Sequence, residues 1–148
     1  MMKQFKIKQL NVYEDFLQQF THCELVDILL WIKAVIKPHI KEKFLVYSDE
    51  VFMIVDKTIT GNPDIQKAKK LAQKLHKVAK TLKNDDQFYI QALAHAVSAT
   101  HIKTRALVVS KYILQLVRFQ SKDPDTIIGE RMRHIVLLNN DVSPTENK

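Results

Sequence analysis

Glycine and proline are scarce in this chain, and their scarcity limits the folds open to it. Two glycines and four prolines occur in 148 residues, and residues 64–123 contain neither. β-Sandwiches and barrels need a turn roughly every 8–12 residues, and glycine and proline supply most such turns. We therefore predict an all-α bundle of about six or seven helices, forming a single domain over residues 1–148.

Residues 64–83 show the clearest helical pattern, with apolar residues on one face and lysines on the other. Asn62 is the expected N-cap, followed by Pro63 at the first helical position and Asp64 near the positive helix end. The pattern predicts a peripheral helix with one face in the core. That face comprises Ile65, Ala68, Leu71, Ala72, Leu75, Val78, Ala79 and Leu82.

The most continuously apolar part of the chain, residues 86–119, predicts the centre of the fold. The segments on either side of residues 100–104 are apolar around most of a helix circumference, and such helices are buried. Residues 100–104 are polar and β-branched, so we expect a sharp bend there. The expected arrangement is a central buried helical hairpin.

Two helices are expected before this hairpin. Residues 13–20 fit a short helix, and residues 23–36 fit a largely buried one. Thr21 is a plausible cap for the second helix, with Glu24 at the reciprocal position of a capping box.

Two further segments carry weaker signals. Residues 44–60 fit a β-hairpin, and residues 49–58 fit a short helix equally well. An isolated hairpin is rarely stable alone, which favours the helix, but for residues 44–55 the choice stays open. A last helix is expected over residues 126–138, with a flexible tail over residues 139–148.

The positive charge of the chain is concentrated in one segment. The formal net charge is +7, and residues 64–83 carry seven lysines against the single acidic residue Asp64. This lysine face is either a solvated surface or a site for an anionic partner, protein or nucleic acid. The segment has no arginine or aromatic residue to read or stack a base, so sequence-specific binding is not expected. The candidate contacts are Lys67, Lys70, Lys74 and Lys77.

The single cysteine, Cys23, excludes an intramolecular disulfide and favours a reducing compartment. The N-terminus lacks the apolar core of a signal peptide. The longest apolar run, residues 25–36, is shorter than the roughly 20 residues that span a bilayer. We expect a cytoplasmic protein without a membrane partner.

No catalytic or cofactor motif stands out. Two glycines in total rule out a glycine-rich phosphate loop. His22 and Cys23 are adjacent, so on a helix their side chains point about 100° apart and do not face each other. No catalytic, cofactor-binding or metal-ligating residue is predicted, and no cofactor is expected.

Three polar residues, His95, His101 and Arg105, interrupt the central hairpin. Six residues on a straight helix place the two histidines about 120° apart, which suits a shared metal poorly. The cation Arg105 also stands where a third ligand would be expected. Three interpretations remain: hydrogen bonding to backbone groups freed by the bend, a binding surface or pocket, and a metal or chemical site.

A second polar cluster lies in the last predicted helix. Glu130 precedes His134 by four residues, while Arg131 and Arg133 are expected on other sides. The pair is either a surface ion pair or a carboxylate that orients a histidine of the central hairpin.

Small residues and histidines follow a recognisable pattern in residues 94–107. The matching positions are Ala94, His95, Ala96, Val97, Ala99, Thr100, His101, Ile102, Thr104, Ala106 and Leu107, followed by Tyr112. This stretch resembles the signature of a bacterial family of all-helical immunity proteins associated with polymorphic toxin systems. Looser agreement extends the resemblance over residues 25–138, at Leu30-Trp31, Gly61 and Glu130-Arg131.

The chain departs from the family pattern at Ala94, Lys103 and Arg105, where the pattern has glycine, proline and a third histidine. The resemblance implies a non-enzymatic protein that neutralises a toxin by binding it, with homo-oligomerisation left open. The alternative is a nonspecific phosphate- or nucleic-acid-binding protein that acts through the lysine face of residues 64–83.

Overall fold

The computed structural model describes the backbone of residues 13–146 and the side chains as far as Asn139. All regular structure in this range is helical, so the predicted all-α fold is confirmed and residues 44–55 are helix, not hairpin. A helical segment over residues 13–22 comes first. It is followed by α2 (Leu25–Ile36), η1 (Lys37–His39), η2 (Glu42–Phe44), α3 (Leu45–Ile59), α4 (Ile65–Lys80), α5 (Asn84–Ser98), α6 (Arg105–Gln120) and α7 (Pro124–Glu146).

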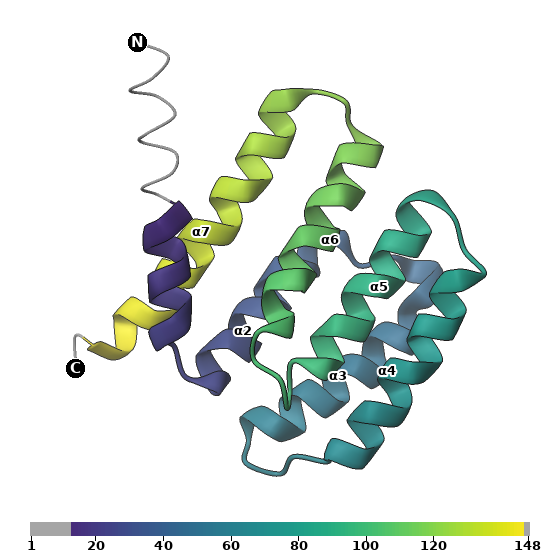
Figure 1. Ribbon diagram of the computed structural model, residues 1–148, viewed down its shortest axis with the longest axis horizontal. Helices are drawn as coiled ribbons and strands as arrows, with labels where there is room; N and C mark the ends of the chain where they lie inside the picture. Colours follow the sequence, from purple (N-terminus) through teal and green to yellow (C-terminus); the bar gives the residue numbers. More distant parts are fainter. Residues whose placement is uncertain (1–12, 147–148) are drawn as a thin grey trace.

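The helices form two layers. Helices α4, α5, α6 and α7 follow one another as an up-and-down row, and α2 and α3 lie behind them (Figure 1). In this arrangement α5 contacts α3, α4 and α6, while α2 contacts α3, α6 and α7. The α5–α6 pair is therefore the central buried hairpin that residues 86–119 predict.

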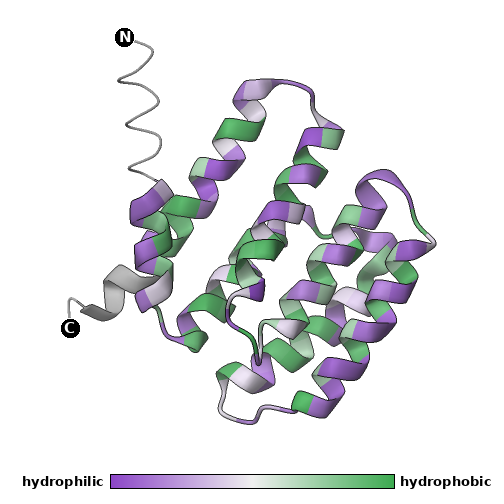
Figure 2. Cartoon of the chain, in the orientation of Figure 1, coloured by the Kyte–Doolittle hydropathy of each residue, from purple (hydrophilic) through white to green (hydrophobic). Residues whose placement is uncertain are grey.

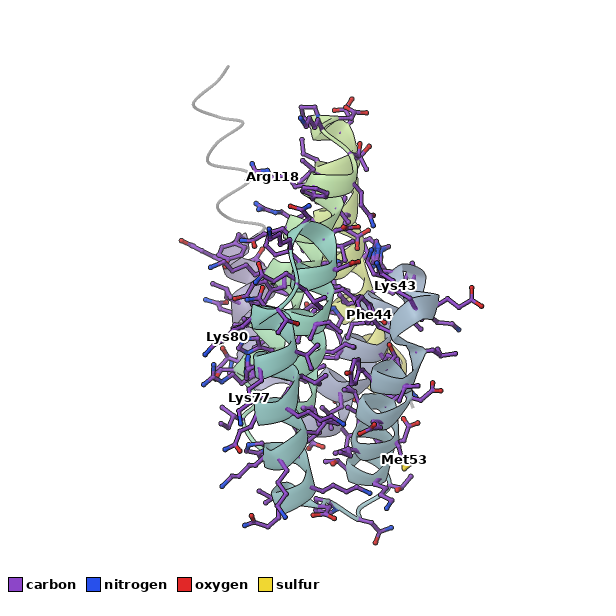
Figure 3. The ribbon with its side chains drawn as sticks, turned by 90° about the vertical axis from the view of Figure 1, so that its right-hand side faces the viewer. Lys43, Phe44, Met53, Lys77, Lys80 and Arg118 are labelled. Atoms are coloured by element: carbon purple, nitrogen blue, oxygen red, sulfur yellow. The ribbon has the colours of Figure 1, made fainter. Side chains whose placement is uncertain are left out.

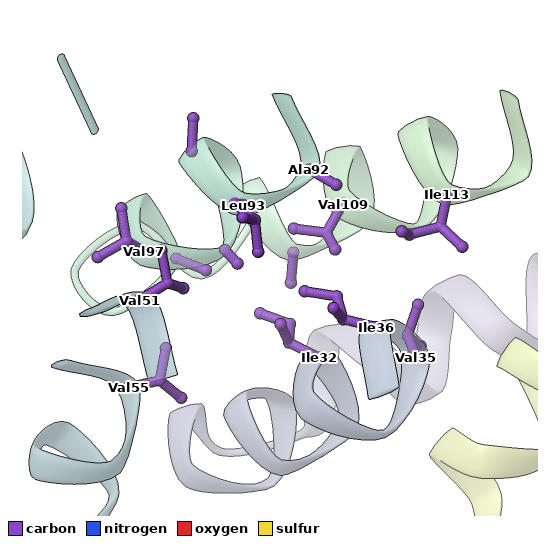
Figure 4. Close-up of a cluster of buried hydrophobic side chains, with 14 of the residues drawn as sticks. Ile32, Val35, Ile36, Val51, Val55, Ala92, Leu93, Val97, Val109 and Ile113 are labelled. Atoms are coloured by element: carbon purple, nitrogen blue, oxygen red, sulfur yellow. The ribbon is translucent and has the colours of Figure 1, made fainter. Parts of the chain in front are cut away.

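The core lies where the two layers meet. Figure 4 shows branched aliphatic side chains from α2 and α3 directed toward those of α5 and α6. Trp31 and Tyr89 are the largest fully buried side chains. Ala92, Ala94 and Ala96 are fully buried on α5, and their small size allows the neighbouring helices to approach closely.

Helix α4 has the predicted peripheral position, with Leu71 and Leu75 buried and its outer face hydrophilic (Figure 2). The predicted N-cap, Asn62, is wrong. The cap is Asp64, whose Oδ1 accepts a hydrogen bond from the Lys67 backbone N–H at 3.1 Å. Pro63 thus precedes the helix, and the carboxylate satisfies one of the free N–H groups of the first turn.

The structure defines three helix boundaries that the sequence left open or misplaced. Gly61 ends α3 with φ +90°, and the N–H groups of Gly61 and Asn62 donate to the Thr58 and Lys57 carbonyls, as in a Schellman motif. Thr21 is not the cap of α2, because its hydroxyl donates to the Leu17 carbonyl at 2.8 Å. Helix α7 extends to Glu146, beyond the predicted end at residue 138.

Ion pairs also connect the start of η2 to the start of α5. Lys41 contacts Asp85 at 2.7 Å and Asp86 at 3.1 Å, in the first turn of α5. Although burial raises the pKa of Asp86, hydrogen bonds from Lys43 and Lys41 lower it overall. Carboxylates at this position also interact favourably with the positive end of the helix dipole. Within residues 13–146, no helix is both long and apolar enough to cross a membrane.

Candidate functional site

The bend predicted at residues 100–104 lies between α5 and α6, but the histidines do not satisfy its backbone. The N–H groups of Thr100 and His101 donate to carbonyls one turn earlier, at 3.3 and 3.2 Å. Among the described residues, the one hydrogen-bond contact of the His101 ring is between its Nδ1 and the Thr100 hydroxyl, at 3.5 Å. Instead, the Lys103 ammonium donates to the carbonyls of Thr21 and Cys23, at 3.0 and 2.9 Å. Lys103 thus ties the bend to the end of the helical segment of residues 13–22 and to Cys23, which follows it.

His95 is buried between α4 and α6. Its ring lies 5.2 Å from the His76 ring and stacks on Tyr112 at 5.5 Å, centroid to centroid. It is 9% exposed, and its Nδ1 has no hydrogen-bond partner among the described residues. Burial, with the positive charges of His76 and Arg105, lowers the pKa of His95 from 6.5 to about 4. His95 is therefore neutral at pH 7.

The three polar residues of the central hairpin differ in burial, although the charge of Arg105 acts on both histidines. His95 is buried within α5, His101 is half-buried on the turn, and Arg105 is exposed at the start of α6. Burial and nearby cations lower the pKa of His101 as well. Over the described range, no group of three or more His, Cys, Asp or Glu side chains is placed to hold a metal ion.

Replacing His95 with phenylalanine is expected to reduce the sensitivity of the fold to acid. The folded-state pKa lies below the unfolded value, so the unfolded chain binds more protons between about pH 6.5 and 4, and stability falls as the pH drops through that window. From pH 7 to pH 5 the loss attributable to His95 is about 2 kcal/mol. Urea unfolding at both pH values measures it.

The matched control for that experiment is His22→Gln, at an exposed histidine. His95→Phe keeps a ring against Tyr112 and removes the titrating nitrogens. His76 and His101 titrate in the same direction, so the variant keeps part of the acid response. An equal loss of stability in the wild type and in His95→Phe contradicts the assignment.

Glu130 is the centre of a buried polar network, not part of a surface ion pair. Its Oε2 lies 2.7 Å from His134 Nε2 and 3.0 Å from His39 Nε2. The Arg133 guanidinium also donates to both carboxylate oxygens. His134 is 2% exposed and the Glu130 side chain 11%. Glu130 therefore orients His39 and His134, and its hydrogen bonds among the described residues do not include His95 or His101.

This network, which we call the Glu130 network (His39, Glu130, Arg133, His134), fastens α7 to α2. Arg133 donates to the carbonyls of Ala34 and Val35, at 3.1 and 2.8 Å, in the last turn of α2. Trp31 Nε1 donates to the His134 carbonyl at 2.8 Å. The last carbonyls of a helix have no partner within it, so Arg133 satisfies groups that burial would otherwise penalise.

The protonation states in the network follow from its contacts. Burial raises the pKa of Glu130, but hydrogen bonds from His134, His39 and Arg133 outweigh it and hold the pKa far below its usual value. Burial lowers the pKa of His134 despite the adjacent carboxylate. A neutral His134 therefore donates from Nε2 to Glu130 and accepts the Ser110 hydroxyl at Nδ1, where the distance is 2.7 Å.

The Ser110–His134–Glu130 chain has the order of a nucleophile, a base and an orienting acid. Acyl transfer also needs N–H donors aimed at the developing oxyanion. Ser110 lies inside α6, where helical hydrogen bonding uses the backbone N–H. The hydrogen bond between the Ser110 hydroxyl and His134 Nδ1 also links α6 to the α2–α7 attachment.

The lysine face has the position that the sequence predicts. Lys67, Lys70, Lys74 and Lys77 are exposed on α4, and Figure 3 shows Lys77 and Lys80 projecting outward. None of the four forms an ion pair with another described residue. Lys74 lies 5.6 Å from the centre of the Tyr47 ring. This face lies on α4, whereas the Glu130 network joins α7 to η1 and the end of α2.

A groove separates α6 from α7, with residues 13–22 as a third wall. Its volume is about 880 Å³. Apolar side chains from both helices line it, together with Lys111, Arg118 and Arg131. Of the predicted site residues, only Arg131 and His134 line this groove.

Several residues of these sites were not predicted from the sequence. His39 and Ser110 are far in sequence from Glu130, so helical spacing gave no signal for them. Arg133 stands three residues after Glu130, and an i, i+3 spacing could have indicated the contact. The prediction that Arg133 lies on another side of the helix is wrong.

These features define an all-helical protein with two candidate binding surfaces, the lysine face and the α6–α7 groove. A family model described as "Imm-5 like putative immunity protein" matches residues 24–141. The chain belongs to this family. No curated protein and no solved structure matches it.

Proposed function

We propose that this protein neutralises a toxin by binding and occluding it, without catalysing a reaction on it. The observation that carries the proposal is the match to the immunity-protein family over residues 24–141. Binding requires a preformed surface of suitable shape and charge. The α6–α7 groove, held in shape by the Glu130 network, supplies one. The proposal places this action in the cytoplasm, where a single thiol stays reduced.

Co-expression with any candidate toxin encoded beside its gene tests this function. A bacterial host carrying the inducible toxin is expected to stop growing, and co-expression of this chain is expected to restore growth. An empty vector is the control for expression load. Failure to restore growth while this chain accumulates in soluble form contradicts the proposal.

The competing proposal is a nonspecific phosphate or nucleic-acid binder acting through the lysine face. Six lysines on α4, with Lys83 just beyond its end, favour it, because neutralised phosphates release counterions. We expect this face to bind labelled duplex DNA or RNA only at low salt, with no saturable binding below about 100 µM at physiological salt.

Fluorescence anisotropy at several salt concentrations measures that binding. The variant Lys70→Glu/Lys74→Glu/Lys77→Glu is expected to lose the low-salt signal and to keep toxin protection. Micromolar binding at physiological salt that disappears in this variant favours the competing function instead.

A further inference from the structure

The α6–α7 groove combines exposed apolar surface with unopposed positive charge. Its walls include Leu107 and Leu114 on α6 and Ile127 and Ile135 on α7, all only partly buried. The apolar surface continues over the outside of α7 through Ile128, Met132 and Val136, which are 52%, 44% and 47% exposed. Contiguous apolar surface of this kind is characteristic of a site that another protein covers.

The fixed charges that line the groove are all cationic: Lys111, Arg118 and Arg131. All three are exposed, and none forms an ion pair with another described residue. By contrast, Lys33, Lys41 and Lys43 elsewhere on the surface contact carboxylates. The groove therefore complements an apolar surface that carries negative charge at its margins.

The walls of the groove are helical, which favours a helix as the occupant. On α6 they recur from Leu107 through Lys111 and Leu114 to Arg118, and on α7 from Ile127 through Arg131 to Ile135. Each set lies on one face of its helix. These two faces and residues 13–22 form three helical walls, and a partner helix in the groove packs against all three. Residues 107–118 rise about 16 Å, which corresponds to three turns.

We propose that this groove receives an amphipathic helix of the toxin, about three turns long, with apolar anchors and acidic flanks. This inference rests on the proposed function, whose partner it describes. Apolar side chains of the toxin helix fill the groove, and its carboxylates meet Lys111, Arg118 and Arg131.

Charge disfavours two other occupants. Residues 1–12 of this chain carry three lysines and no acidic residue, so they would add positive charge to a positive groove. A second copy of the chain brings a net charge of +7 to the same surface. An acidic partner is favoured over both by attraction and by the rate of encounter.

Charge reversal with a matched control tests the proposal. A purified toxin that this chain neutralises in the co-expression test is titrated by calorimetry with the wild type and with Lys111→Glu/Arg131→Glu. The control, Lys70→Glu/Lys77→Glu, makes the same change of net charge on α4. We expect the groove variant to bind at least 30-fold more weakly and the control to stay within threefold of the wild type. Leu114→Ser is expected to weaken binding about tenfold. Circular dichroism verifies that each variant folds.

The other outcomes distinguish failure of the groove assignment from failure of the proposed function. Equal affinity of the groove variants and the wild type overturns the groove assignment and leaves the proposed function standing, as does equal weakening by groove and control variants. Tighter binding after deletion of residues 1–12, or a wild-type dimer that the groove variants dissociate, assigns the groove to the chain itself and overturns the acidic partner. No binding by the wild type refutes the proposed function, and this inference with it.

Discussion

Replacing Glu130 with alanine is expected to lower the free energy of unfolding by about 3–5 kcal/mol, the usual effect of removing one partner from a buried charge network. The change leaves His39 and His134 without their common acceptor and Arg133 without its counter-ion. Urea unfolding at pH 7, followed by circular dichroism, measures the loss. Because such a loss approaches the whole stability of many domains, Glu130→Gln provides a milder variant, with an expected loss of about 1–3 kcal/mol.

Glu42→Gln is the matched control for this change. Glu42 is exposed and forms no ion pair with another described residue, so its replacement is expected to stay within about 0.5 kcal/mol of the wild type. Hydrogen exchange adds a local readout, since α7 amides of Glu130→Gln are expected to exchange faster than those of α5. A stability of Glu130→Ala within 1 kcal/mol of the wild type, on the same scale, refutes the structural role of the network.

Replacing Trp31 with alanine is expected to have a similarly large effect, about 3–5 kcal/mol. The indole is fully buried and lies against the rings of Phe16 and Phe20, with centroids 5.8 and 6.1 Å away. Its Nε1 also donates to the His134 carbonyl. Alanine leaves a cavity that the surrounding helices fill only in part.

Trp31→Phe is a milder change at the same position. It keeps one six-membered ring in the core but removes the pyrrole part of the indole with its Nε1 donor, so the lost hydrogen bond and a small cavity together are expected to cost about 1–3 kcal/mol by urea unfolding. The double variant Trp31→Phe/Glu130→Gln is expected to be non-additive, because both changes loosen the same α2–α7 attachment. Additivity within 0.3 kcal/mol indicates two independent contacts and contradicts a shared attachment.

Local periodicity was sufficient to predict most of the helices of this fold, with α3 as the exception. The lysine and apolar faces of residues 64–83 gave α4, and the apolar segments around residues 100–104 gave the α5–α6 hairpin. Helix ends were less predictable, because Asn62 and Asp64 are both good caps and the choice depends on which residue the first free N–H reaches. For residues 44–55, β-branched composition suited strand and helix alike, and packing against α5 decides for helix.

The contacts of the candidate site were harder to predict from the sequence than the helices. Glu130 and His134 share one helix, so spacing alone brought them together. His39 lies 91 residues from Glu130 and Trp31 lies 103 residues from His134, and these contacts exist only because α2 and α7 pack together. Whether Glu130 was buried also depended on that packing, which is why a surface ion pair was a reasonable expectation.

The groove likewise exists only because segments distant in the sequence pack together in the fold. Lys111, Arg118 and Arg131 are dispersed in a sequence whose obvious basic segment is α4, and they share a surface only because α6 and α7 run side by side (Figure 1). Composition drew attention to the lysine face, where charge lies on a helix with little exposed apolar surface. The groove combines both properties.

A titration of toxin activity with this protein tests most directly whether it acts by binding. Purified toxin is held at a fixed concentration well above the dissociation constant, and its activity is measured after addition of increasing amounts of this chain. Occlusion predicts that inhibition rises linearly, is complete at about one equivalent, and does not change with incubation time. Inhibition that deepens with time at far less than one equivalent indicates turnover and contradicts the account, as does full toxin activity in the presence of several equivalents.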